Sequence, residues 1–158
     1  MASPQPTAET SLRISRTYPA PREEVFRAWT DPKVLERWFA PDPEFVTKVP
    51  VLELRPGGRY RLEMTKGGAT HVVVGQYREI RPPEKLVYTW KWEVSDMAGS
   101  FEDTIVTLEF HDRGRETELV LTHEKLPNAE ERGKHEHGWN GCLAQLARYI
   151  SEREKRGV

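Results

Sequence analysis

Apolar residues recur along the chain at two spacings, and the change between them predicts where helices and strands lie. Alternating apolar positions over 12–18 indicate a first strand, which two prolines end. From Val25 to Phe39 the apolar residues instead recur at three- and four-residue steps, the spacing of one helix face. Asp31 followed by a proline interrupts that run and is typical of a helix N-terminus. We therefore expect two short helices directly after the first strand.

From residue 44 to 124 the period falls to two, the repeat of a half-buried strand. Short segments rich in Gly, Pro and Asp interrupt the alternation and are typical of turns. They lie at 56–58, 66–68, 81–84 and 112–114, with a longer loop at 96–100. Consecutive strands joined by tight turns predict an antiparallel meander. Gly75 falls inside one predicted strand, where it indicates a bulge or the close approach of another group.

The last predicted element is a long helix over 129–153. Asn128 stands at the expected cap position, and an apolar stripe follows at three- and four-residue steps. The stripe consists of Trp139, Cys142, Leu143, Leu146 and Ile150. Gly133, Gly138 and Gly141 also fall within the helix, and each lowers helix stability by about 1 kcal/mol relative to alanine. A kink or a looser first half is therefore expected.

The order of elements predicts an α+β fold. One long apolar stripe needs one sheet to cover it, so a curved antiparallel sheet of about six to seven strands should wrap around the C-terminal helix. We expect a single domain over 11–154. Residues 1–10 carry two prolines and little apolar content, which predicts a disordered N-terminal tail, and 155–158 form a short C-terminal tail.

Composition and charge narrow the classes of function. The 158 residues include 24 Lys and Arg against 25 Asp and Glu, a net charge of −1, which argues against nucleic acid or an anionic membrane as the partner. No apolar run approaches the ~20 residues of a membrane-spanning helix. The first ten residues lack the features of a secretory signal, so a cytoplasmic location is expected. The single cysteine, Cys142, cannot form an internal disulfide or a thiolate zinc site.

Several short segments follow one another in a distinctive order. They are Ala20-Pro21 with 25–29, Asp31-Pro32, Gly57–Tyr60, Gly75–Ile80, Leu86–Trp92, Leu119–Glu124 and Gly138-Trp139. Their order and spacing over 12–152 resemble the activator of heat-shock protein 90 ATPase homologue-like family, within the START-like (SRPBCC) superfamily. The resemblance implies a helix-grip fold. It also implies a cavity between the sheet and the C-terminal helix, which members use for lipids, sterols, polyketides and other apolar molecules.

Candidate ligand contacts lie on the face that the predicted sheet and the last helix share. They are Tyr60, Leu62, Met64, Tyr88, Trp90, Trp92, Val106, Leu108, Phe110, Leu119, Leu121, His123, Trp139, Leu143 and Leu146. Large aromatic side chains with polar tips suit such a pocket, although an ordinary packed core would use the same residues. A ligand site predicts a cavity above roughly 300 Å³.

Polar residues offer little support for catalysis. By alternation His123 and Arg16 should point inward, where each would anchor a ligand or make a structural hydrogen bond. His135 and His137 are two residues apart on a helix and cannot chelate one metal ion together. Cys142 lies on the apolar stripe, where a thiol behaves as a small hydrophobe. We assign no catalytic residue, no metal and no cofactor.

Three hypotheses for function follow from these observations. The first is non-covalent binding of a small hydrophobic or amphipathic ligand, with His123 or Arg16 as the polar anchor. The second is a stress-related module that binds a chaperone, which predicts a filled cavity and an exposed patch. The third is a cyclase- or hydrolase-type enzyme, which needs at least two polar groups converging in the cavity. The open edges of the sheet also allow a homodimer.

Overall fold

The computed structural model describes residues 10–94 and 103–156. The predicted N-terminal tail, apart from Thr10, and the predicted loop at 96–100 lie outside the described residues, as do the last two residues of the predicted C-terminal tail. The elements, in chain order, are β1 (Leu12–Tyr18), α1 (Arg22–Thr30), α2 (Pro32–Trp38), β2 (Val46–Leu52), β3 (Arg59–Lys66), β4 (Ala69–Arg81), β5 (Lys85–Val94), β6 (Thr104–Arg113), β7 (Glu116–Glu124) and α3 (Ala129–Arg156).

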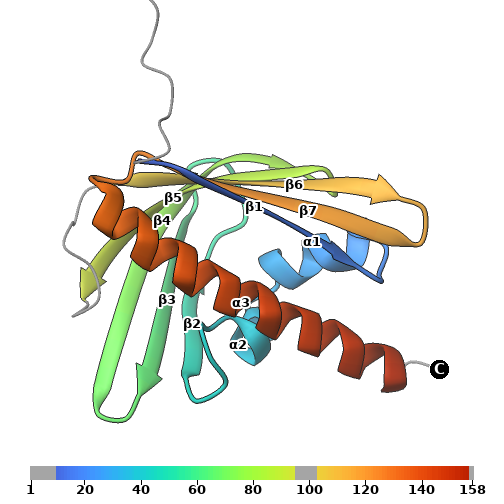
Figure 1. Ribbon diagram of the computed structural model, residues 1–158, viewed down its shortest axis with the longest axis horizontal. Helices are drawn as coiled ribbons and strands as arrows, with labels where there is room; N and C mark the ends of the chain where they lie inside the picture. The colour runs from blue at the N-terminus through green and yellow to red at the C-terminus, as the bar shows by residue number, and fades with distance from the viewer. Residues whose placement is uncertain (1–9, 95–102, 157–158) are drawn as a thin grey trace, which may run out of the picture.

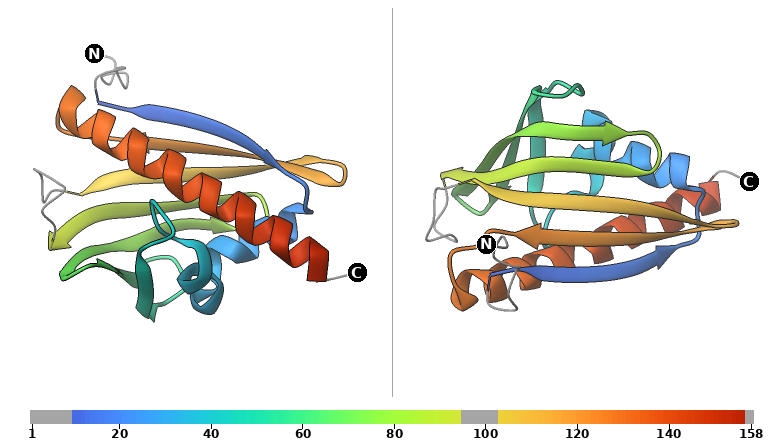
Figure 2. Two further views of the ribbon diagram at one scale, coloured as in Figure 1. Left: turned by 60° about the horizontal axis from the view of Figure 1, so that its bottom comes forward. Right: turned by 90° about the horizontal axis from the view of Figure 1, so that it is seen from above.

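The seven described strands form one antiparallel sheet in the order β1-β7-β6-β5-β4-β3-β2. Neighbours from β2 to β7 are consecutive in sequence, as the predicted meander requires, and β1 pairs with β7 so that Leu12 lies opposite His123. Figures 1 and 2 show α3 lying diagonally across one face of the curved sheet, with α1 and α2 on the same face. The predicted helix-grip fold is therefore confirmed.

Side-chain caps fix the starts of α2 and α3. The Asp31 Oδ1 accepts a hydrogen bond from the Lys33 backbone N–H at 3.0 Å, and Pro32 follows in the first turn of α2. At α3 the Asn128 Oδ1 accepts from the Glu131 backbone N–H at 2.9 Å. Both caps lie where the sequence predicts them. Each satisfies a backbone donor that the start of a helix leaves without a partner.

Gly75 on β4 leaves room for the Tyr60 ring of β3, which reaches past β4 to contact β5. It lies opposite Tyr60 in the β3–β4 pair, and the Tyr60 hydroxyl donates to the Thr89 carbonyl oxygen on β5. A Cβ at Gly75 would lie 2.1 Å from that same oxygen and 2.6 Å from Cε2 of Tyr60. The close approach predicted at this glycine is confirmed, because only a residue without a side chain leaves room for the ring.

The glycines of α3 do not interrupt it. α3 runs from Ala129 to Arg156 as one helix, and Figure 1 shows no kink, so the expected kink is wrong, whereas a looser first half stays a prediction. Packing against the sheet stabilises the helix more than its glycines weaken it. A Cβ at Gly133 would meet no atom within 4 Å, whereas a Cβ at Gly141 would lie 2.0 Å from the Pro41 carbonyl oxygen. Gly141 therefore lets α3 approach the segment that follows α2.

We expect the same substitution at these two glycines to have opposite effects on stability. Gly141→Ala should lower the free energy of unfolding by about 1–3 kcal/mol, because its methyl group collides with backbone at Pro41. Gly133→Ala should raise it by about 0.5–1 kcal/mol, because alanine favours the helix and the space is open. Urea unfolding of both variants measures the difference. Equal effects would contradict the close contact at Gly141.

Candidate functional site

All fifteen side chains predicted to contact a ligand are buried, and none is more than 6% exposed. Seven of them line two small voids between the sheet and the helices. A void of about 60 Å³ is bounded by Met64, Trp90, Trp92 and Trp139, and another of about 20 Å³ by Tyr60, Leu62 and Tyr88. Both voids are far smaller than the 300 Å³ expected from the sequence. The side chains fill most of the space that the alternation predicts between sheet and helix.

The other eight candidates line neither void. They are Val106, Leu108, Phe110, Leu119, Leu121, His123, Leu143 and Leu146. Each is at most 1% exposed, and all of them except the polar His123 belong to the continuous apolar core. Several residues that the sequence analysis did not select complete the larger void, namely Phe39, Pro41, Lys134, His135, Gly138 and Cys142. Contact between these interior residues and a ligand stays a prediction.

His123 faces α3, as predicted, and both its ring nitrogens have protein partners. The Trp139 Nε1–H lies 2.9 Å from the His123 Nδ1. Because an indole N–H can only donate, Nδ1 must be the acceptor and the ring carries its proton on Nε2. That proton points to the Thr104 hydroxyl oxygen at 2.7 Å, and this hydroxyl donates in turn to the Trp90 carbonyl oxygen at 2.8 Å. The geometry therefore requires a neutral imidazole.

His135 on α3 repeats this arrangement with a second tryptophan. Its Nε2 accepts from the Trp92 Nε1–H at 2.9 Å, and its Nδ1 donates to the Glu131 carbonyl oxygen at 2.7 Å. The centroids of the His135 and His123 rings lie 5.1 Å apart, edge to face. With all four ring nitrogens occupied by protein groups, neither imidazole is available to a substrate as an acid or a base.

Burial lowers the pKa of both histidines. For His123 the main cause is complete removal from water, and the neighbouring His135 lowers the pKa further. For His135 burial also dominates, partly opposed by the hydrogen bond to the Glu131 carbonyl. Burial likewise raises the pKa of the Cys142 thiol well above its ordinary value, so the thiol stays protonated and unreactive.

Arg16 lies at the exposed edge between β1 and α3 and not in the interior between the sheet and the helix, so its predicted inward position is wrong. The side chain is exposed and donates to the Asn140 Oδ1 on α3 at 2.6 Å. Its backbone follows the alternation of β1, but the long side chain carries the guanidinium past the apolar surface into water. The polar anchor that the sequence analysis assigned to Arg16 is therefore absent from the interior.

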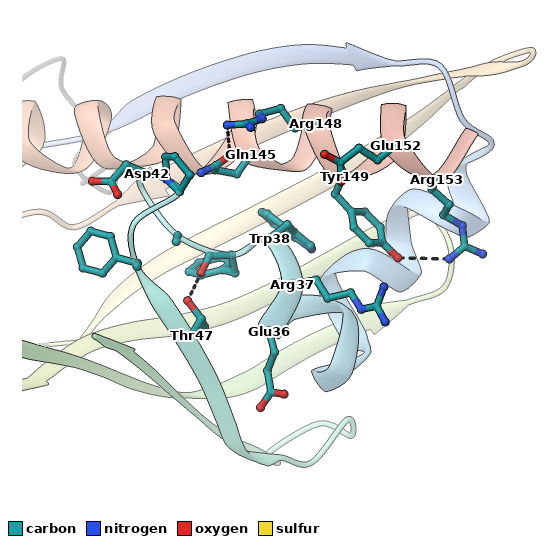
Figure 3. A pocket seen from close by; sticks show the side chains of 14 residues that line it. Glu36, Arg37, Trp38, Asp42, Thr47, Gln145, Arg148, Tyr149, Glu152 and Arg153 are labelled. Atoms are coloured by element: carbon teal, nitrogen blue, oxygen red, sulfur yellow. Dashed lines mark hydrogen bonds between the residues drawn. The ribbon is translucent and has the colours of Figure 1, made fainter. Parts of the chain in front are cut away.

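A larger hollow lies outside the core, between α2, the 39–47 segment and the C-terminal half of α3 (Figure 3). Its volume is about 600 Å³. We call it the α2–α3 groove. α3 contributes five residues at three- and four-residue steps, which place them along one helix face. They are Gln145, Arg148, Tyr149, Glu152 and Arg153.

The floor of the α2–α3 groove is apolar and held by hydrogen bonds. Trp38 and Phe39 are buried there, with ring centroids 5.3 Å apart. The Trp38 Nε1–H donates to the Ala28 carbonyl oxygen at 3.0 Å. The Thr47 hydroxyl donates to the Phe39 carbonyl oxygen at 2.6 Å. The half-buried Phe45 adds a further aromatic ring to the groove lining.

Charged side chains surround this floor, and most of the acidic groups already have partners. Asp42 accepts a hydrogen bond from the Lys66 ammonium group at 2.9 Å, which lowers the pKa of its carboxyl group. Glu36 accepts from the Val49 backbone N–H at 2.9 Å and extends away from the groove in Figure 3. Among the groove side chains that the structure describes, only Asp42 and Arg153 are in ion pairs, with Lys66 and Glu24. Arg37 is one of the rim residues without such a pair, and the rim carries unpaired groups of both signs.

Sequence reasoning missed this groove. The apolar stripe of the last helix drew attention to its buried face, whereas the groove uses the neighbouring stripe of mixed character. The repeat of polar and aromatic residues from Gln145 to Arg153 is a signal that indicates a second, half-exposed face. The sequence does not show that α2 lies opposite that face.

Comparison with known proteins identifies the family. The model of the family described as Activator of Hsp90 ATPase homolog 1-like protein matches residues 19–151. The chain belongs to this family. The resemblance found in the sequence is thereby confirmed, and the START-like fold of the family agrees with the architecture described above. A search of the curated proteins found no match.

Solved structures of the family superimpose on most of the chain. A protein from Chromobacterium violaceum is 31% identical, with a TM-score of 0.79, over 89% of this chain and 96% of that one. The AHSA1 protein from Silicibacter pomeroyi is 27% identical, with a TM-score of 0.77, over 90% and 99%. An HSP90 activator from Plasmodium falciparum is 25% identical, with a TM-score of 0.69, over 90% and 96%. Within the described residues, no helix has the length and apolar character needed to span a membrane.

We expect stability to fall as the pH is lowered through the range of histidine titration. The folded pKa of His123 lies below the unfolded value of about 6.5, so the unfolded chain takes up its proton first. The contribution of the neutral, buried histidine to the free energy of unfolding is complete above about pH 6.5. Below that pH the contribution declines by at most about 1.4 kcal/mol per pH unit for each histidine. Urea unfolding at pH 7, 6 and 5 measures this slope.

The matched variants are His123→Gln and His137→Gln. The first should reduce the slope between pH 7 and 5, because it removes the buried imidazole. The second is the matched control, because it makes the same replacement at an exposed position on α3. An unchanged slope in His123→Gln would show that burial of this imidazole does not govern the pH response.

Proposed function

We propose that this protein binds a small amphipathic molecule in the α2–α3 groove. The observation that supports the proposal best is a hollow of about 600 Å³ that joins a buried aromatic floor to a charged rim. Small-molecule sites have volumes of roughly 300–1,000 Å³ and combine apolar walls with a few polar groups. The groove meets both conditions, whereas each interior void is too small for a drug-sized ligand.

A floor that exists before the ligand arrives favours binding. The hydrogen bonds of the Trp38 indole and of the Thr47 hydroxyl tie the floor to backbone carbonyls of α1 and of Phe39. A ligand would therefore not have to order these side chains, which lowers the entropic cost of association. The half-buried rings of Phe45 and Tyr149 would offer apolar surface to the hydrophobic part of the molecule, whereas Trp38, 3% exposed, would support them from below.

Aromatic residues of the interior pack against the side of the groove floor that faces the core. Trp29 lies against Trp38 with ring centroids 4.8 Å apart, and Phe39 contacts Trp90 and Trp139 at 6.2 and 5.8 Å. These aromatic contacts connect the floor to the core between sheet and α3. Direct contact of the interior residues with a ligand would require the two voids to enlarge.

A bulky side chain placed in the groove should weaken binding. We expect Gln145→Trp to raise the Kd for the neutral fluorescent amphiphile N-phenyl-1-naphthylamine at least tenfold, because Gln145 is half-buried in the groove lining. Ala144→Trp adds the same side chain at the adjacent exposed position and should change the Kd less than twofold. Fluorescence titration measures both. Equal affinities for the two variants would place the site elsewhere, and no binding by the unmodified protein would remove the proposal.

A second candidate function is binding to an Hsp90-type chaperone. The observation in its favour is the Plasmodium falciparum HSP90 activator, which is 25% identical over 90% of this chain. The nearly filled interior also agrees with the expectation for an interaction module. A role in the stress response, a cytoplasmic location and a homodimer stay predictions.

If the chain activates such a chaperone, it should raise the ATPase rate of a purified Hsp90 at least twofold when added in equimolar amount. The control is the chaperone with bovine serum albumin at the same concentration. An unchanged ATPase rate, together with no complex on analytical ultracentrifugation, would exclude this candidate. The Gln145→Trp variant in the same assay separates it from the ligand proposal, because activation should survive when the groove is filled.

A further inference from the structure

The two ends of the α2–α3 groove differ in character. Asp42 lies at one end in Figure 3, and its chain neighbours Pro43 and Phe45 also line the groove. At the other end Tyr149 extends from α3 toward Arg37 of α2, and Arg153 lies beside it (Figure 3). An elongated molecule in this groove would have its apolar part against aromatic rings and its other end near two guanidinium groups.

We infer that the ligand is an anionic amphiphile whose carboxylate binds at the Arg37–Tyr149–Arg153 end of the groove. This inference rests on the proposed function, since it names the chemical class that the same groove would accept. Guanidinium groups are suited to carboxylates because their planar set of donors matches the two oxygens. Arg37 is free to do so, because no ion pair engages it among the described side chains.

The Tyr149 hydroxyl can donate a hydrogen bond to the carboxylate of a ligand. Its hydroxyl oxygen accepts a hydrogen bond from the Arg153 Nη1 at 3.3 Å, and the Arg153 Nε is paired with the Glu24 carboxylate at 2.6 Å. Because the oxygen is the acceptor in this contact, the hydroxyl proton remains available to donate to a ligand oxygen. Glu24 thus pairs with Arg153, Arg153 donates to Tyr149, and in Figure 3 the Tyr149 hydroxyl points toward Arg37.

The acidic residues of the groove do not cancel this preference. The Asp42 carboxylate is paired with Lys66 at the Phe45 end, and Glu36 is bonded to backbone and points away. Glu152 is exposed, as Arg37 is, and in Figure 3 its carboxylate lies beside α3, away from the Tyr149 hydroxyl and Arg37. Arg37 lines the groove and has no ion-pair partner among the described side chains, so a ligand carboxylate would give it one.

The test compares two probes of equal chain length, decanoate and 1-decanol, by isothermal titration calorimetry at pH 7.5. We expect decanoate to bind at least tenfold more tightly than decanol. Arg37→Gln should abolish that difference. Arg13→Gln, which removes one positive charge from an exposed position on β1, should preserve it. Chemical-shift changes in ¹H–¹⁵N spectra at Tyr149 and at the side-chain Nε–H of Arg37 would place the carboxylate.

Each other outcome overturns a distinct statement. Equal affinity for decanoate and decanol would overturn the anionic class and leave the proposed function standing. A decanoate preference that persists in Arg37→Gln would overturn the assignment to this end of the groove. If neither probe binds, and N-phenyl-1-naphthylamine does not bind either, the proposed function fails and this inference fails with it.

Discussion

The close contact between α3 and the inner face of the sheet is the constraint on which the rest of the structure depends. The apolar stripe of α3 contributes Trp139, Leu143 and Leu146, each at most 2% exposed, to the core. The Tyr18 hydroxyl of β1 donates to the Leu143 carbonyl oxygen at 3.0 Å, which ties the helix to the edge of the sheet. Gly141 removes the side chain that would otherwise hold α3 away from Pro41. The helix can therefore lie deep in the curve of the sheet.

The depth at which α3 packs into the curve of the sheet determines where free space remains. The inner face carries so many large aromatic rings that sheet and helix leave voids of only about 60 and 20 Å³. Trp90 of β5, Trp139 of α3 and Phe39 at the end of α2 contact one another with centroids 4.9 to 6.2 Å apart. Dense packing of this kind strongly disfavours any further group in the core. A hollow of about 600 Å³ lies instead outside the core, between α2 and the C-terminal half of α3.

Polar groups are used differently in these two regions. Inside the core, His123 and His135 are each paired with a tryptophan and a second partner, so their hydrogen-bonding capacity is consumed by the protein. Such saturated networks fix side-chain geometry and leave nothing to react with a substrate. At the rim of the α2–α3 groove, Arg37 and the Tyr149 hydroxyl keep donors available. The two histidines therefore serve the structure of the core, whereas the groove rim presents donors to solvent.

The sequence by itself determined the elements, their order and the family. Local signals account for this: alternation defines the strands, Asp31 and Asn128 cap their helices, and Gly75 marks a close approach. It also identified which side chains are buried, since all fifteen candidates lie in the core. Only the tertiary structure decided whether those side chains line a cavity or fill it, because void volume depends on the depth at which α3 packs. It likewise placed Arg16 at the rim and brought α2 opposite Tyr149, since both depend on distances between elements far apart in the chain.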